Sequence, residues 1–407
     1  MRPVQTTPVH RTSQLAELVC SNSLKSDLED SAQGLLKREM RTLGSLLLAC
    51  ADETRVPAGS ALAVDRDLFA AAVTDRILGH PLIELVREEI TRVPPEGITI
   101  IATGPLTSEK FSRELQRLTG EEHLYFFDAI APSVTAESLN KGKVFKASRY
   151  GKGSDDYYNC PMTREEYETF YRELVNADIK EGHSIDRKLF FDSCMPIEVI
   201  ARRGEDTLRF GPMRPVGLSP GIDQPKPYAV VQLRQEDVEG RIYGLVGFQT
   251  RLRWGEQDRV FRLIPGLEKA EFVRYGVMHR NTYINSPAVL MPTLQFKPDG
   301  RILFAGQISG VEGYMESAAT GIFAAINALR ILAGKSPAVL PAVTMIGALL
   351  QFITQTDPDN FQPVNANFGL LPSLAAPVRD KKNRYAAYVR RSLQEMDKFS
   401  ELFLKKL

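Results

Sequence analysis

A glycine-rich turn in the last third of the chain carries the residues best suited to hold a phosphate group or a flavin. Gly306, Gly310 and Gly313 lie in this turn together with Glu312, directly after the apolar run 301–305. Glycines let backbone N–H groups approach a diphosphate or a flavin edge, and the N-terminus of a following helix adds partial positive charge. The spacing is neither Gly-x-Gly-x-x-Gly nor a P-loop. A tight strand-to-helix turn whose glycines serve packing therefore explains it equally well.

A second glycine, Gly104, follows another short apolar run, 97–102. We expect this run to be a buried strand that stops at the glycine. A glycine at the end of a second buried strand fits the same cofactor site, although by itself it is weak evidence.

Two of the four cysteines, Cys20 and Cys194, have surroundings in which a thiolate could act as a nucleophile. Cys20 lies in a small polar segment that follows an apolar one, and a pair of arginines follows Cys194. Nearby cations favour the thiolate, the form of cysteine that attacks carbon. From sequence context alone, a structural role is the commoner one for both residues. Cys50 and Cys160 are expected to be packing residues.

Composition excludes several classes of protein. No His-Glu-x-x-His or Cys-x-x-Cys spacing occurs, so no metal site is predicted. Nothing approaches the ~18 uninterrupted apolar residues of a membrane span, and the first residues do not resemble a signal peptide. The unpaired cysteines suggest reduced thiols of a cytosolic protein. With 51 Lys+Arg against 50 Asp+Glu, a polyanion such as RNA could be held only by a local basic patch.

One such patch spans 141–152, where Lys143, Arg149 and Lys152 alternate with aromatic residues. Lysine and arginine contact phosphates, and tyrosine or phenylalanine stacks on bases, so the segment would suit a folded RNA. An ordinary solvated run of charges has the same appearance. From this segment alone that second explanation is favoured.

Alternating helices and strands are expected to position these groups, which indicates an α/β layer architecture. The expected elements are helices over 30–49, from 65 onward, over 107–120 and over 313–333, and strands over 97–102 and 301–306. In the middle of the chain the pattern of expected helices and strands is different. A capping box at 163–166 starts a helix there. Its β-like runs are 228–233, 242–250 and 259–264. We interpret this middle part as an α+β insertion.

Several motifs, taken in chain order, resemble one known family. They lie at 18–24, 128–132, 159–163, 194–198, 203–213, 246–250, 254–257, 274–282 and the glycine turn. The series resembles the folate- and FAD-dependent tRNA (uracil-5-)-methyltransferases, which are relatives of the GidA flavoproteins. The match covers almost the whole chain, and so many ordered, rare motifs make chance similarity very improbable.

The resemblance implies a cytoplasmic methyltransferase. Such an enzyme takes a methylene carbon from 5,10-methylenetetrahydrofolate, reduces it to methyl through FAD with NADH or NADPH as reductant, and places it on C5 of the T-loop uridine of tRNA, forming ribothymidine. The implied partner is the tRNA T-arm, with no metal, no membrane and a monomeric or weakly homo-oligomeric state. The family's two functional cysteines fall on Cys20 and Cys194. Its phosphate- and flavin-contacting turn falls on the three glycines and the glutamate of the turn described above.

The implied fold is an α/β protein with a split Rossmann-like FAD-binding domain interrupted by an α+β insertion domain. We expect the first part of the FAD-binding domain over 1–145, the insertion domain over 146–290, and the second part with C-terminal helices over 291–407. Family members carry a Gly-x-Gly-x-x-Gly βαβ unit before a Met-Arg-Pro sequence, and this chain starts at that sequence. We therefore expect that first unit to be missing and flavin to bind weakly.

Two other functions are compatible with the motifs. One is a truncated, catalytically inactive homologue that still binds RNA. The other is a GidA-like subunit for wobble-uridine modification. The segment 194–198 and the short C-terminal tail favour the methyltransferases over the GidA-like subunit.

Overall fold

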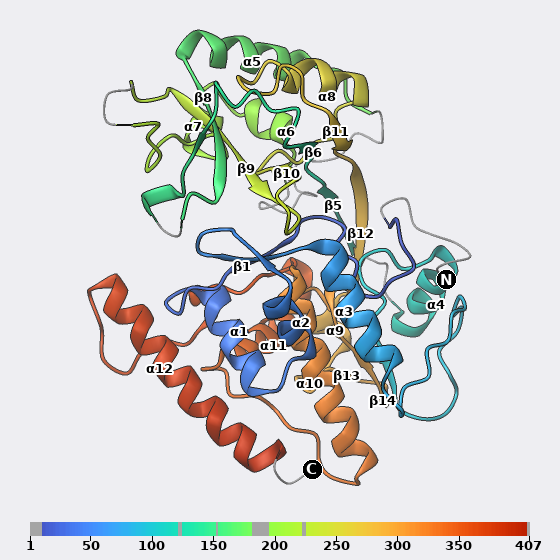
Figure 1. Ribbon diagram of the computed structural model, residues 1–407. Helices are drawn as coiled ribbons and strands as arrows, with labels where there is room; N and C mark the ends of the chain where they lie inside the picture. Colours follow the sequence, from blue (N-terminus) through green and yellow to red (C-terminus); the bar gives the residue numbers. More distant parts are fainter. Residues whose placement is uncertain (1–9, 121–123, 152–153, 181–194, 222–224, 405–407) are drawn as a thin grey trace.

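Two hydrophobic cores organise the chain. The computed structural model describes residues 10–120, 124–151, 154–180, 195–221 and 225–404 (Figure 1). One core collects buried side chains from 18–115 and 283–399, and the other collects them from 134–270. The chain thus enters the second core before the expected boundary at 145 and has left it before 290. A two-stranded ribbon, β5 (Leu124–Ala129) paired with β12 (Met278–Tyr283), joins the two parts.

The first part, which we call the terminal part because it contains the first and the last segments that the structure describes, contains two small sheets. In one sheet β14 (Asp299–Phe304) pairs in parallel with β4 (Thr99–Ile101) and antiparallel with β13 (Gln295–Phe296). The other has the order β1 (Ser23–Ser26), β3 (Ala61–Val64), β2 (Arg55–Val56). Around them lie the helices α1 (Ala32–Thr42), α2 (Leu46–Glu53), α3 (Arg66–Leu78), α4 (Glu109–Thr119), α9 (Ser286–Val289), α10 (Tyr314–Leu332), α11 (Met345–Gln355) and α12 (Lys381–Phe399).

The sequence prediction for this part is confirmed at α3 and α4 and wrong at α1. Asp65 caps α3, and α4 runs from its cap at Ser108 to Gly120 in the left-handed region. The single helix expected over 30–49 is instead two helices. Gly44 between them has φ 74°, a conformation that breaks an α-helix.

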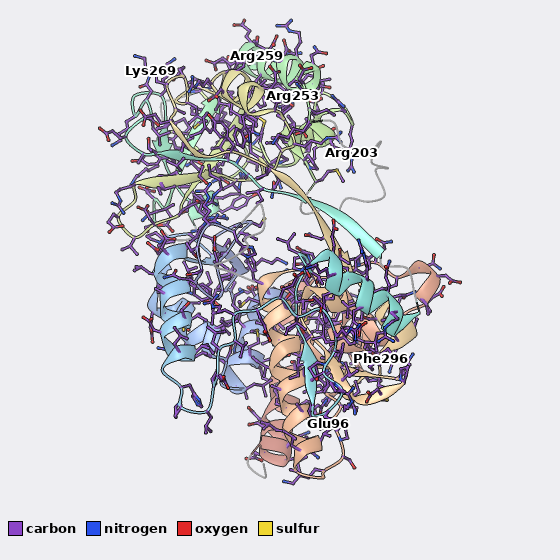
Figure 2. The ribbon with its side chains drawn as sticks, turned by 90° about the vertical axis from the view of Figure 1, so that its right-hand side faces the viewer. Glu96, Arg203, Arg253, Arg259, Lys269 and Phe296 are labelled. Carbon is purple, nitrogen blue, oxygen red and sulfur yellow. The ribbon has the colours of Figure 1, made fainter. Side chains whose placement is uncertain are left out.

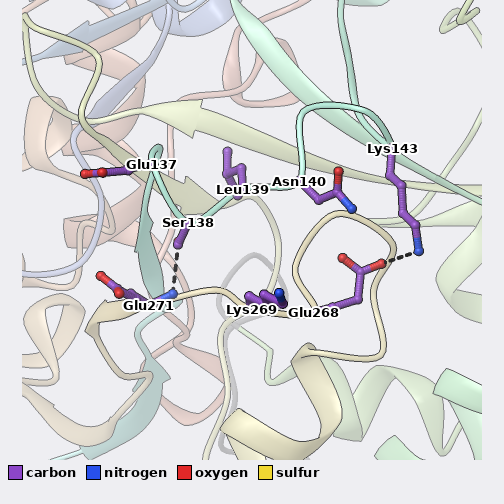
Figure 3. A pocket seen from close by; sticks show the side chains of 8 residues that line it. All are labelled: Glu137, Ser138, Leu139, Asn140, Lys143, Glu268, Lys269 and Glu271. Carbon is purple, nitrogen blue, oxygen red and sulfur yellow. Dashed lines mark hydrogen bonds and ion pairs between the residues drawn. The ribbon is translucent and has the colours of Figure 1, made fainter.

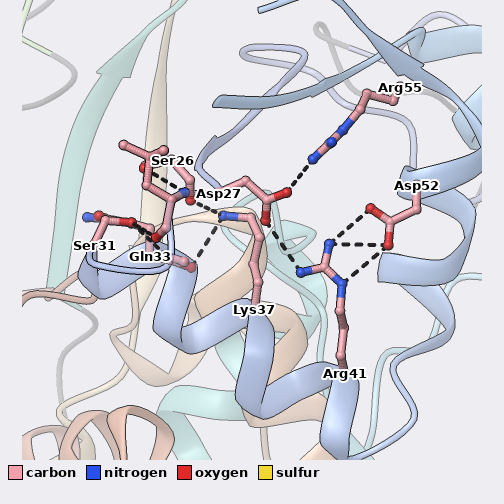
Figure 4. A network of polar contacts seen from close by, with 10 residues as sticks. Ser26, Asp27, Ser31, Gln33, Lys37, Arg41, Asp52 and Arg55 are labelled. Carbon is pink, nitrogen blue, oxygen red and sulfur yellow. Dashed lines mark hydrogen bonds and ion pairs between the residues drawn. The ribbon is translucent and has the colours of Figure 1, made fainter. Parts of the chain in front are cut away.

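Polar side chains on α1 fix the segment that contains β1 (Figure 4). Lys37 is buried and donates to the carbonyl of Ser26 at 2.8 Å, and burial lowers the pKa of Lys37 to about 8. Arg41 pairs with Asp52 of α2 at 2.9 Å and with Asp27, just after β1, at 3.4 Å. These contacts hold the end of β1 and the residue that follows it against the helical layer.

The second part, which we call the middle part, is built on one antiparallel sheet of six strands. Its order is β11 (Phe272–Arg274), β6 (Ser133–Thr135), β10 (Ile242–Leu245), β9 (Ala229–Gln235), β8 (Tyr157–Met162), β7 (Phe145–Lys146). Its helices are α5 (Arg164–Asn176), α6 (Ile197–Ala201), α7 (Thr207–Phe210) and α8 (Trp254–Phe261). The capping box predicted at the start of α5 is confirmed by reciprocal hydrogen bonds between Thr163 and Glu166.

One expected strand of the middle part is wrong. Residues 259–264 were expected to be β-like, but α8 extends through Phe261. Gln257, Val260 and Phe261 are buried at helical spacing, so the apolar run belongs to one face of a helix. In the described part of the chain no helix is both long enough and apolar enough to cross a membrane.

Candidate functional site

Two of the predicted cofactor residues follow adjacent parallel strands. Phe304 of β14 pairs with Ile101 of β4, so Gly306 and Gly104 come just after neighbouring strand ends. The Gly306 N–H donates to the Thr320 hydroxyl of α10 at 2.7 Å, which fixes the turn against that helix. In open α/β sheets, ligands bind in the crevice beyond the carboxyl ends of the strands. The sheet therefore places these two glycines where a cofactor would be expected.

The space around the four glycines separates them into two pairs. A Cβ on Gly104 would meet nothing within 4 Å, and a Cβ on Gly306 would meet only the Ser317 Cβ at 4.0 Å. On Gly310, in contrast, it would lie 2.3 Å from the Phe361 ring, and on Gly313 2.2 Å from Glu316. Contact with the Phe361 ring explains the missing side chain of Gly310. At Gly313 the neighbouring atoms are the flexible ends of Glu316 and Lys25, and the φ of 117° favours glycine there. The Cβ positions of Gly104 and Gly306, in contrast, face free space, although Gly306 itself is buried.

This difference predicts unequal effects on stability. Gly310→Ala is expected to lower the free energy of unfolding by about 3 kcal/mol or more, because the methyl group collides with Phe361 and φ is positive. Gly306→Ala adds the backbone strain alone, about 1–2 kcal/mol. Urea denaturation measures both values. Phe361→Ala should cost less in the Gly310→Ala background than in the wild type, and equal losses for the two glycine variants would contradict the packing argument.

Glu312 is held inside the turn by a lysine from β1. Its Oε2 lies 3.5 Å from Lys25 Nζ, and Lys25 also pairs with Glu316 of α10 at 3.2 Å. Glu316 in turn accepts from the Ala366 N–H at 3.1 Å. Burial raises the pKa of Glu312, an effect that Lys25 opposes. The carboxylates therefore connect the turn, β1 and the segment before α12.

Cys20 lies against the end of the glycine turn. Its N–H donates at 2.9 Å to the hydroxyl of Tyr314, the first residue of α10, which is 294 positions away in the sequence. Arg66 donates to the carbonyls of Leu18 at 2.5 Å and Cys20 at 3.4 Å. The structure thus brings Cys20, the turn and Gly104 into one region of the terminal part. Cys20 itself is half-buried.

The other cysteines differ from Cys20. Cys50 and Cys160 are completely buried, and burial raises the pKa of each thiol, so both remain protonated packing residues. Cys194 lies outside the described residues. The segment that follows it is anchored in the middle part, where Met195 is buried and the Ile197 N–H donates to Gln249 at 2.7 Å.

The predicted RNA-binding residues that the structure describes already have partners. Lys143 pairs with Glu268 at 2.7 Å, and both line a cavity of about 680 Å³ that also contains Glu137 and Glu271 (Figure 3). Arg149 donates to the carbonyls of Arg214, at 2.9 Å, and Val216, and to Gln232 at 3.0 Å.

Burial lowers the pKa of Arg149. A phosphate would have to replace these contacts of Lys143 and Arg149, and Lys152 lies outside the described residues. In the described ranges, no group of three side chains is arranged to hold a metal ion.

Sequence comparison settles the relationship. The family described as Glucose inhibited division protein A, or GidA, matches residues 3–336. The chain belongs to the GidA family. It is 65% identical over 404 residues to a protein of Syntrophomonas wolfei named methylenetetrahydrofolate–tRNA-(uracil-5-)-methyltransferase TrmFO, covering 99% of this chain and 93% of that protein. A Bacillus subtilis protein of the same name is 53% identical over 401 residues, covering 98% and 92%.

A solved GidA-family structure agrees with this fold. The structure of Aquifex aeolicus GidA superimposes with a TM-score of 0.66 at 17% identity, over 95% of this chain and 68% of that one. The similarity confirms a mixed α/β fold of the GidA type. The resemblance inferred from the ordered motifs is confirmed as well, because the relatives carry the name of that methyltransferase family.

Sequence reasoning missed a cluster of charged residues beside Cys20. Arg66 of α3 pairs with Glu236, just after β9, at 3.0 Å, and Arg274 of β11 lies 3.9 Å from the same carboxylate. Arg234 of β9 donates to Ser21 at 2.6 Å and to Asn22 at 2.9 Å. The members come from both parts and from distant segments, so no spacing along the chain links them. The only signal was that Arg274 begins one of the ordered motifs.

Proposed function

We propose that this chain methylates C5 of a uridine in tRNA and takes the carbon from methylenetetrahydrofolate. The names of relatives that share more than half of its residues support this activity. The main structural support for this activity is the hydrogen bond from the Cys20 N–H to the Tyr314 hydroxyl. That contact sets a thiol beside the turn in which we place the cofactor.

The cofactor that we propose is FAD, lying beyond the ends of β4 and β14 against Gly104 and Gly306. When bound, it would supply the electrons that reduce a methylene carbon to methyl, and NADH or NADPH would restore them. Open space at the two glycines, where a Cβ meets nothing closer than 4.0 Å, supports this placement. Gly310, Glu312 and Gly313 would then shape the turn and orient α10 toward the cofactor.

This assignment implies a split Rossmann-like FAD-binding domain, 1–145 and 291–407, interrupted by an insertion domain over 146–290. The two hydrophobic cores support such a division. They favour transitions nearer to 130 and 277, because Val134 and Ala270 already belong to the middle core and Tyr283 belongs to the terminal one.

We infer that two thiols take part in the reaction. C5 of uracil is a poor nucleophile, and addition of a thiolate to C6 makes it reactive by moving electron density onto C5 and the neighbouring carbonyl. We assign this addition to Cys194 and a role on the cofactor side to Cys20. The hydrogen bond from Cys20 to the first residue of α10 supports the second assignment. C5 would then attack the methylene carbon. After loss of the C5 proton, a hydride equivalent that the cofactor would supply when bound would convert the methylene to methyl as the thiolate leaves C6, which restores the C5–C6 double bond and gives ribothymidine.

The RNA partner that we propose is the T-arm of tRNA, bound by a monomer or weak homo-oligomer in the cytoplasm. Its phosphates would be contacted by Lys143, Arg149 and Lys152. Lys143 would exchange Glu268 for a phosphate, and Arg149 would have to release a carbonyl. The prediction for this surface is therefore best tested at the two lysines.

Changing Lys143 and Lys152 together to glutamine is expected to weaken tRNA binding and flatten its salt dependence. Removing one lysine–phosphate ion pair should reduce the slope of log K against log salt concentration by about one. Fluorescence anisotropy at several salt concentrations measures that slope. Lys398→Gln is the control, because Lys398 forms a comparable ion pair with Glu395 on α12. An unchanged slope in the double variant would show that the basic segment is ordinary surface.

The activity itself is tested with an unmodified tRNA transcript, methylenetetrahydrofolate, NADH or NADPH, and FAD added in excess. We expect 5-methyluridine in the digested RNA. A transcript whose T-loop uridine is replaced by cytidine should gain none. Product at other uridines of the transcript would reject the T-loop as the target, and absence of product from both transcripts would reject the activity.

A further inference from the structure

The charged cluster beside Cys20 lies where the two parts of the molecule meet. Glu236 is at its centre, because its carboxylate accepts from Arg66 at 3.0 Å and from Ser133 at 2.9 Å. Gly244 of the adjacent strand β10 makes room for it, since a Cβ there would lie 2.4 Å from Glu236 Oε1. The cluster is therefore built into the sheet of the middle part and reaches α3 of the terminal part.

The cluster contains more positive than negative charge. The carboxylate of Glu236 is attracted electrostatically to three guanidinium groups, those of Arg66, Arg234 and Arg274. Three positive charges and one negative charge leave two positive charges in excess. Burial, together with repulsion from Arg66, lowers the pKa of Arg274 to about 10, although Glu236 opposes this shift. The nearby carboxylates have other partners, since Asp65 caps α3 and Asp237 pairs with Arg241.

Two buried N–H groups of the cluster have no acceptor among the residues that the structure describes. These are Nε of Arg66 and one terminal nitrogen of Arg274. The Arg66 side chain is only 10% exposed, so bulk water does not readily replace the missing partner. Buried donors without an acceptor are costly, and buried positive charges without compensation are costlier still. Both features point to an absent ligand that is negatively charged.

We propose that Arg66 and Arg274 form a binding site for an oxyanion of a substrate, at the junction of the two parts beside Cys20. This inference rests on the proposed function, which supplies two oxyanions of suitable chemistry, an RNA phosphate and the carboxylate of a folate. Either one would satisfy the free N–H groups and balance the excess charge. Because Arg66 also holds the carbonyls of Leu18 and Cys20, the bound anion would be fixed relative to that cysteine.

Arg274→Gln is the cleanest variant with which to test the site. The contact that the structure gives to the Arg274 side chain is the 3.9 Å pair with Glu236, whereas Arg66 supports the backbone around Cys20. Removing one of three crowded cations should leave the fold intact, which the unfolding midpoint would verify. Arg274→Lys keeps the charge and should retain most of the binding. Arg253→Gln, on the exposed outer surface of the middle part, is the matched control (Figure 2).

The measurements are dissociation constants for a T-arm RNA hairpin, for tetrahydrofolate and for tetrahydropteroate, which lacks the glutamate. One of the two oxyanion-bearing ligands should bind about 10–100-fold more weakly to Arg274→Gln, the loss expected for one charged hydrogen-bonding group. If the RNA phosphate occupies the site, only the hairpin is affected. If the folate carboxylate occupies it, tetrahydrofolate is affected and tetrahydropteroate is not.

Unchanged affinities for the hairpin and for tetrahydrofolate would overturn the oxyanion site. So would equal losses for tetrahydrofolate and tetrahydropteroate, or a fall in turnover with both affinities unchanged. A wild-type protein that binds neither the hairpin nor tetrahydrofolate would instead count against the proposed function itself.

Discussion

Replacing Cys20 with alanine is expected to reduce methyl transfer to tRNA by a factor on the order of 1000 or more. A thiol that takes part in covalent chemistry has no substitute in the site, and losses of that size are usual for such groups. The Cys20 side chain is not part of either core, so the variant should fold and bind the cofactor like the wild type. Incorporation of label from methylenetetrahydrofolate into unmodified tRNA measures the effect.

The other cysteines provide controls for this experiment. Cys194→Ala should abolish transfer as Cys20→Ala does, because both thiols belong to the proposed reaction. Cys50→Ala and Cys160→Ala remove buried thiols and should keep substantial turnover, with any loss accompanied by a lower unfolding midpoint. Full activity of Cys20→Ala would remove this residue from the mechanism.

The contribution of one buried carboxyl group, Glu39, to the stability of the protein is expected to fall as pH rises from about 4.5 to 7. Glu39 of α1 accepts the N–H groups of Met345 at 2.6 Å and Ile346 at 2.8 Å, and the hydroxyl of Ser392. Burial raises its pKa from 4.5 to about 7 in the folded protein, against the effect of these hydrogen bonds. Between these values the folded state keeps a proton that the unfolded state has lost, so the free energy of unfolding decreases with pH.

Comparison with Glu39→Gln isolates this group from all others. The free energy of unfolding of the wild type minus that of the variant should decrease by about 3 kcal/mol between pH 4.5 and 8, and most steeply below pH 7. Urea denaturation at several pH values measures the difference. Glu29→Gln, at a residue whose side chain is 83% exposed, should show no such trend. A difference that increases with pH would mean that the hydrogen bonds, rather than burial, dominate.

The sequence was informative where local chemistry decides the structure. The apolar runs before Gly104 and Gly306 predict strands, which form as β4 and β14, but the burial expected for β4 is wrong because Ile100 is exposed. The cap at Asp65 and the capping box at Thr163 predict helix starts. Each of these signals lies within a few residues of the feature that it produces. The same local signals fail at 259–264, because a short apolar run fits a strand and one face of a helix equally well.

The candidate site was only partly predictable. The glycine turn and Cys20 could be singled out, but their contact depends on Tyr314 reaching the segment before β1 across the sheet. Whether a glycine serves a ligand or packing depends on what stands beside it, such as Phe361 at Gly310. The cluster of Arg66, Arg234 and Arg274 exists only because α3 meets the end of β9 in the middle sheet. Such contacts arise from the tertiary fold, and no periodic pattern in the sequence corresponds to them.

The source of the transferred carbon tests the central claim most directly. The protein is incubated with an unmodified tRNA transcript, excess FAD, NADH or NADPH, and methylenetetrahydrofolate that carries deuterium on the methylene carbon. The nucleosides are then analysed by mass spectrometry. We predict 5-methyluridine that retains both deuterium atoms, because the methylene group is transferred intact and then reduced. Unlabelled 5-methyluridine, or product that forms only when S-adenosylmethionine replaces the folate, would contradict the proposed function.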